Sequence, residues 1–97
     1  MAKDVLIIGD SRMTAHQPGP GHPECPERLI TLLENLPSSP LLTREPAKRT
    51  SREHLHWIHR PEMVDAVEAC RGTHGAFDPD TRYSPASVEA AYLAVGA

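Results

Sequence analysis

The part of the 97-residue chain whose residue types could do chemistry is Gly21-His22-Pro23-Glu24-Cys25-Pro26-Glu27-Arg28. Each proline fixes φ and removes a backbone donor, so the sequence predicts a stiff loop here. Pro26 suits the first turn of a helix, and leucines at 29, 32, 33 and 36 continue at helical spacing. Arg28 then lies at the edge of that helix's apolar face, where its cation can point back toward whatever the loop surrounds.

The elements that must position this loop alternate between strand and helix. Residues 5–8, Val-Leu-Ile-Ile, read as a strand of a buried parallel sheet. Residues 9–25 form a long loop, and loops of that length usually have a function. A helix is expected over about 26–36, followed by a short strand over 41–45. Together these elements predict a right-handed strand–helix–strand unit.

The second half of the chain is predicted to be mostly helical. Thr50 and Glu53 form a possible capping box that opens a helix. Its apolar residues would be Leu55, Trp57 and Ile58.

A further helix is expected to begin at Pro61 and to end at Gly72. One side of it would carry Met63, Val64, Val67 and Cys70.

Residues 72–83 are predicted to be a loop, after which Ser84 caps a last helix with Pro85 in its first position. The closely packed positions of that helix would be Val88, Ala91, Ala94 and Val95.

Composition excludes several classes of protein. The net charge is −3 and no run of lysine and arginine exceeds two residues, which argues against a dedicated nucleic-acid binder. No apolar run approaches the length of a membrane span, and the segment after Met1-Ala2-Lys3-Asp4 is too short for a signal peptide. Cys25 and Cys70 do not form a disulfide framework. We therefore expect a cytoplasmic protein that binds neither nucleic acid nor membrane.

Several short motifs follow one another along the chain. In order they are Asp10, Met13, His16, His22 through Arg28, Leu55, His59, Asp78, Asp80-Thr81, Ser84-Pro85, Ser87, Ala90-Ala91 and Gly96-Ala97. This order of motifs resembles the histone deacetylase and acetylpolyamine amidohydrolase family, in its bacterial or class II branch. Met63 departs from the family pattern, which often has an aromatic residue there.

The resemblance implies an α/β fold, the N-terminal portion of an arginase/deacetylase-like parallel-sheet fold with about two strands and four helices. Residues 1–97 would be a single truncated domain. The family hydrolyses amides of acetyl-lysine or acetylated polyamines with one zinc ion held by two aspartates and a histidine, beside a histidine pair. This chain has no His-His pair and no Asp-x-His motif. We therefore expect no catalytic residue, no metal and no cofactor in the chain itself, and no activity of the chain alone.

By resemblance, the substrate or product-channel residues are Arg28, His22, Pro23, Glu24 and His16. The loop from His16 to Glu24 would rim the substrate tunnel, and Arg28 would hold the acetate product, since a guanidinium can bind a carboxylate bidentately. Two simpler interpretations stay open. Arg28 could pair with Glu24 or Glu27 on the helix surface, and the two histidines could hold the loop's shape by hydrogen bonds to backbone.

Other residues have competing interpretations. His59 is interpreted as a buried structural histidine, and Asp78 and Asp80 as turn and cap residues. Two pairs, His22 with Cys25 and Cys70 with His74, have the spacing of zinc ligands and leave a structural zinc as an alternative. The alternative function is a non-catalytic, self-associating scaffold or interaction module. The expected partner is a second copy of the chain or the remainder of a deacetylase domain.

Overall fold

The structure is a computed structural model that describes residues 4–97. Residues 1–3, which belong to the segment used to argue against a signal peptide, lie outside the described residues. Strands β1 (Val5–Ile8) and β2 (Leu42–Glu45) pair in parallel, and helix α1 (Pro26–Asn35) lies between them in sequence. The predicted α/β class and the strand–helix–strand unit are confirmed.

The two-stranded sheet is half-exposed. Val5 pairs with Leu42 and Ile8 with Glu45, and this register continues at the end of β1, where Gly9 N–H donates to Glu45 O over 3.2 Å. Yet Val5 and Leu6 keep 51% and 52% of their surface exposed. The sheet therefore positions the loops at its end without forming the core.

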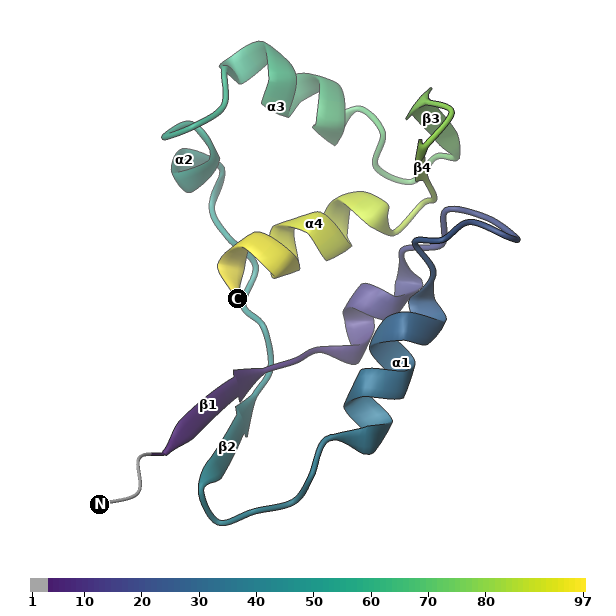
Figure 1. The fold of residues 1–97 in the computed structure, drawn as a ribbon. Coiled ribbons are helices and arrows are strands. Elements are labelled where there is room, and N and C mark those ends of the chain that lie inside the picture. The colour runs from purple at the N-terminus through teal and green to yellow at the C-terminus, as the bar shows by residue number, and fades with distance from the viewer. Residues whose placement is uncertain (1–3) are drawn as a thin grey trace.

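The later helices and the second pair of strands lie away from β1 and β2 (Figure 1). The first part of the predicted 9–25 loop is a 3-10 helix, η1 (Ser11–Ala15), which packs against both α1 and the last helix, α4 (Ser87–Gly96). None of the helices formed by residues 4–97 is long and apolar enough to cross a membrane. The elements are η1 (Ser11–Ala15), α2 (Arg52–Leu55), α3 (Pro61–Glu68), β3 (Gly75–Asp78), β4 (Thr81–Tyr83) and α4 (Ser87–Gly96).

The core lies between α3 and α4. Cys70, Val88 and Tyr92 form its buried cluster, and the half-buried Leu55, Val67 and Tyr83 pack against it. Figure 1 shows α4 in the middle of the molecule, with α3 on one side and the two parallel strands toward the other. Burial of Val64 on α3, and of Cys70 in the turn after it, confirms two of the predicted inward positions, whereas Met63 is 48% exposed.

The predicted packing face of α4 is wrong except at Val88. Ala91 and Ala94 are exposed, and Val95 is 59% exposed. The physical reason is that α4 has neighbours on more than one side, because α3 and η1 both pack on it. A single stripe at helical spacing therefore does not describe its burial. The residues of α4 that are buried are Val88, Ala90, Tyr92 and Leu93.

The C-terminal end of α4 lies against the segment that connects β2 to α2. Thr50 N–H donates to Tyr92 O over 3.0 Å. A Cβ atom on Gly96 would clash with the backbone carbonyl oxygen of Lys48. This close approach joins the half of the molecule that contains the parallel sheet to the half that contains the core.

The predicted helix after Thr50 is shorter than the pattern suggests. Ser51, and not Thr50, caps α2 through its hydroxyl, which accepts from His54 N–H at 3.4 Å. Helix α2 ends at Leu55, so Trp57 and Ile58 lie beyond it and are 75% and 85% exposed. The Thr50 hydroxyl instead lies 3.4 Å from Nδ1 of the His54 ring.

Two further predictions in the last third are corrected. Residues 72–83 are not a plain loop, since β3 and β4 form an antiparallel hairpin there. Helix α4 begins at Ser87 with Ala86 as its N-cap, two residues later than predicted. The Ser84 hydroxyl is not a cap because it accepts from Gln17 N–H at 3.0 Å.

Candidate functional site

The proline loop joins η1 to α1 through two glycines in the left-handed region, Gly19 at φ 124° and Gly21 at φ 74°. His22 N–H then donates to Gly19 O over 3.3 Å and closes a turn. Cys25 is extended, as the proline after it demands, and Pro26 occupies the first turn of α1. The predicted loop that passes into a helix at Pro26 is confirmed.

His22 ties this loop to the β3–β4 hairpin. Its Nδ1 atom accepts from Glu24 N–H at 3.1 Å, and its Nε2 atom lies 2.9 Å from Asp80 O. Since Nδ1 must be the acceptor, the proton is on Nε2 and is donated to the Asp80 carbonyl. The interpretation of His22 as a residue that holds the loop by backbone hydrogen bonds agrees with this geometry.

His16 contacts two different elements. Its Nδ1 atom lies 2.6 Å from Ser87 Oγ at the start of α4, and its Nε2 atom lies 3.4 Å from Glu24 Oε2 in the proline loop. The next residue, Gln17, donates its N–H to Ser84 Oγ over 3.0 Å. The loop is therefore attached to α4 at one end and, through His22, to the hairpin at the other.

A cavity of about 280 Å³ brings three of the five predicted site residues together. His16 and Glu24 enter it from the loop and Arg28 from the first turns of α1. The simpler interpretation of Arg28 was an ion pair with Glu24 or Glu27. Among residues 4–97 Arg28 forms no such ion pair. The lining residues are Met13, His16, Glu24, Cys25, Pro26, Arg28, Leu29 and Leu32.

This cavity combines an apolar wall with opposite charges. The methionine and leucines that line it can contact an alkyl group, and Arg28 can bind an anion. A short carboxylate, with a small apolar part and a charged end, fits that chemistry. Pro23 and His22 do not line it, and so act on it only through the loop.

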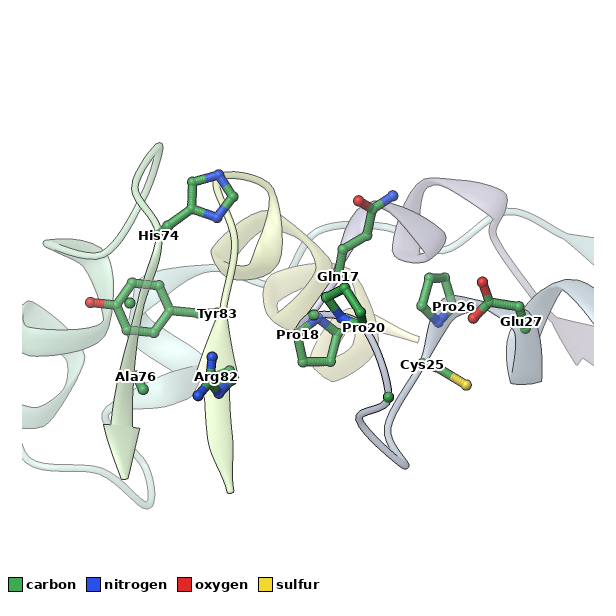
Figure 2. A pocket seen from close by; sticks show the side chains of 13 residues that line it. Gln17, Pro18, Pro20, Cys25, Pro26, Glu27, His74, Ala76, Arg82 and Tyr83 are labelled. Carbon is green, nitrogen blue, oxygen red and sulfur yellow. The ribbon is translucent and has the colours of Figure 1, made fainter. Parts of the chain in front are cut away.

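A second and larger groove lies on the hairpin side of the same loop (Figure 2). Its volume is about 880 Å³, and it shares Cys25 and Pro26 with the first cavity. Figure 2 shows Pro18 and Pro20 on one side of it and Arg82 and Tyr83 on the strand opposite. The proline loop is thus a thin wall between two hollows, one of which contains Arg28.

The motif residue Asp10 lies just behind the loop, at the end of β1. Its buried carboxylate accepts from the backbone N–H of Arg12 at 3.0 Å and from the Arg12 guanidinium at 2.6 Å. These hydrogen bonds, chiefly those of the guanidinium, hold the pKa of Asp10 well below its ordinary value. Asp10 is an ionised anchor of the scaffold and lines neither hollow.

The remaining candidates fall outside the cavity. Asp78 Oδ1 accepts from Asp80 N–H at 2.9 Å, as a turn residue should. Hydrogen bonds from Thr81 and Asp80 lower the pKa of Asp78. His59 is exposed, so its interpretation as a buried structural histidine is wrong. The reason is that α2 ends at Leu55, and the residues after it lie on the surface.

The structural-zinc alternative gains no support from the described part of the chain. Cys25 lines the cavity whereas Cys70 is in the core, where its Sγ donates to Ala66 O over 3.3 Å. Within residues 4–97 no three or more histidine, cysteine, aspartate or glutamate side chains lie close enough together to hold a metal ion.

Sequence reasoning missed the two serines that orient the loop. Ser84 was predicted only as a helix cap and Ser87 only as a motif residue. Ser84 Oγ in fact accepts from Gln17 N–H of the loop, and Ser87 Oγ accepts from Ser84 N–H. Their partners His16 and Gln17 are more than sixty residues away in sequence. The only signal available was the recurrence of serine at the start of a helix.

Comparisons with known proteins identify a similar fold in a solved structure. No family model matches the chain. An uncharacterized protein of Synechocystis sp. is 32% identical over 100 residues, which cover 96% of this chain and 33% of that protein. The crystal structure of the HD domain of HDA15 matches with a TM-score of 0.79 and 28% identity, over 99% of this chain and 29% of that one. The chain thus spans about a third of the length of these relatives and resembles part of a histone deacetylase domain.

Proposed function

We propose that this chain is the N-terminal segment of a histone deacetylase-like amidohydrolase of the bacterial or class II branch. The complete enzyme would hydrolyse the amide of an acetylated lysine or an acetylated polyamine in the cytoplasm. The observation that carries the proposal is the convergence of Arg28, His16 and Glu24 on one small cavity. The same three residues belong to the motif on which the resemblance rests, and the likeness to the HD domain of HDA15 supports it.

In this proposal the chain supplies one wall of the site and no bond-breaking step. Arg28 holds the carboxylate product, because an arginine stays charged and offers paired donors. Glu24 and His16 line the cavity beside Arg28. His22 and Pro23 maintain the conformation of the loop. Zinc chemistry is left to residues that this chain does not contain, so the chain by itself is proposed to be inactive.

Acetate binding tests the role of Arg28. Acetate would be titrated into the folded chain at about pH 6, with NMR shifts of the Arg28 Nε–H and Leu29 methyl groups as the signal. Arg28→Ala should weaken binding about tenfold or more, since a charge-assisted hydrogen bond is lost.

Arg60→Ala is the matched control, because Arg60 is exposed and lies outside both hollows. It should bind acetate like the unmodified chain. Equal affinities of the Arg28 and Arg60 variants would exclude the product-binding role.

The second candidate function is a non-catalytic scaffold that associates with a further copy of itself. The exposure of Val5 and Leu6 on β1 favours it, since a strand of this composition is usually covered. The two functions predict different behaviour: acetate binding at Arg28 in the first, and association through β1 without a ligand in the second.

A further inference from the structure

The hydrogen bonds around His16 fix its orientation and the position of its proton. Ser87 Oγ accepts from Ser84 N–H at 2.8 Å, so its own proton is free for His16 Nδ1, 2.6 Å away. In the neutral ring Nδ1 is then the acceptor and Nε2 carries the hydrogen. That hydrogen points to the side of the ring where Glu24 and the cavity lie.

The same two serines can also hydrogen-bond the protonated form of the His16 ring, and the ring need not move. Ser84 Oγ lies 3.2 Å from Ser87 Oγ. When His16 gains a proton on Nδ1, the Ser87 hydroxyl can turn its hydrogen to Ser84 and accept from the ring instead. Ser84 is buried, so this pair is a fixed support on the protein side of His16.

On the cavity side His16 is held only loosely. The 3.4 Å contact with Glu24 is longer than a strong charge-assisted hydrogen bond, and the Glu24 side chain is 59% exposed. The other charged or titratable groups of this cavity are Arg28 of α1 and Cys25 of the loop. Helix α4 presents Ser87 to the ring, and the two charged residues at the start of η1, Asp10 and Arg12, are paired with each other.

We propose that His16 is the second anion-binding group of the Arg28 cavity, oriented by Ser87, and that its protonation makes the cavity bind a small carboxylate more tightly. The proposal rests on the proposed function, in which this cavity takes a carboxylate product. Histidines change charge between about pH 5 and 8, a range in which a carboxylate stays ionised. Affinity should therefore fall as the pH rises, and binding should take up a proton.

The test repeats the acetate titration of the folded chain at about pH 5.5 and about pH 8. We expect roughly tenfold tighter binding at the lower pH, the effect of one charged hydrogen-bond donor. Calorimetry in two buffers of different ionisation enthalpy should detect proton uptake, which a purely structural histidine would not cause.

Three variants separate the contributions. His16→Asn keeps an oxygen that can accept from Ser87 but cannot gain a proton, so it should bind acetate with the same affinity at both pH values. Ser87→Ala removes the support of the ring and should reduce the pH dependence. His74→Asn alters an exposed histidine of the other groove and should change nothing.

The possible failures are distinguishable. Absence of acetate binding at both pH values would overturn the proposed function. Binding that depends on Arg28 but not on pH, or a pH dependence that persists in full in His16→Asn, would overturn the role of His16 and leave the proposed function intact.

Discussion

The carboxylate of Asp10 fastens the end of β1 to the segment after β2. It accepts from Ala47 N–H at 3.1 Å as well as from Arg12, and the Arg12 guanidinium donates in turn to Ala47 O over 2.8 Å. Two chain segments 37 residues apart are thus joined by one charged side chain. Because η1 starts directly after Asp10, this anchor also fixes the base of the loop that carries His16.

Asp10→Asn should destabilise the chain at neutral pH but much less in acid. The pKa of Asp10 is lower in the folded than in the unfolded chain. Ionised Asp10 therefore stabilises the fold at pH values above its unfolded-state pKa of about 4, and this stabilisation is lost as the pH falls from there toward the folded-state pKa. Thermal unfolding at about pH 7 should show a melting temperature lower by about 5 °C.

Asp4→Asn is the control for this comparison, since Asp4 is exposed and is not bonded to Arg12. A melting-temperature difference between Asp10→Asn and the unmodified chain that stays constant from neutral to strongly acid pH would contradict the assignment.

Residue types in the proline motif could be predicted to meet at one site, but their partners could not. The resemblance of the motif to the deacetylase family indicated Arg28 and His16 as site residues, and both line the same cavity. It gave no reason to connect His16 with Ser87, because that contact requires α4 to cross over η1. Which of several histidines holds a loop and which faces a cavity is decided by such tertiary contacts.

Helices α3 and α4 are joined by Arg71, which lies in the turn after α3. Arg71 donates from Nε to Glu68 over 2.6 Å and from Nη1 to Glu89 over 2.8 Å. The Tyr92 ring lies beside it, with the guanidinium carbon atoms of Arg71 and Arg49 5.4 Å and 4.8 Å from the ring centre. The two glutamates raise the pKa of Arg71 further, so it is charged at every pH of interest.

Arg71→Ala should cost about 1–2 kcal/mol of folding free energy, a value reduced from that of a buried pair because Arg71 is a third exposed. Urea denaturation would measure it. High salt should shrink the loss only in part, since the contact with Tyr92 includes packing.

Arg60→Ala is again the matched control, at the opposite end of α3. If both arginine variants unfold at the same urea concentration, Arg71 is not the connection between the helices.

At the scale of elements, periodicity identified the long ones and failed on the short ones. The leucine spacing located α1 correctly because ten residues repeat a pattern. The hairpin of β3 and β4 escaped because its strands are short and almost wholly exposed, so no apolar alternation marks them. The end of α2 escaped because Trp57 and Ile58 look like core residues in sequence but lie on open surface.

The whole molecule leaves apolar surface uncovered at its sheet. Val5 and Leu6 are half-exposed and Leu32 of α1 is 62% exposed. Within residues 4–97, β1 is bonded to β2 alone, so its other edge keeps unpaired backbone groups. Such an edge pairs readily with another strand, either from a second copy or from the rest of a longer domain.

We predict that the isolated chain self-associates through β1 at micromolar concentration. Leu6→Lys should shift the chain toward monomer, because a charge on an edge strand opposes pairing. Sedimentation equilibrium would measure the change, expected to be about tenfold or more in the dissociation constant.

Ile58→Lys removes a comparably exposed apolar residue far from the sheet, at 85% exposure, and should leave association unchanged. A monomeric, cooperatively folding chain at all concentrations would show that the sheet needs no partner.

The contact of Gly96 with Lys48 bears on the order in which the molecule can be assembled. It closes when α4 is already helical and the segment after β2 is already in place, and the two residues are 48 positions apart in sequence. Contacts of such long separation form late, after the loop-closure entropy has been offset by local structure. The two halves should therefore fold first and dock second. Since a single methyl group at position 96 would obstruct the docking, substitution there should slow the last step of folding while sparing the steps before it.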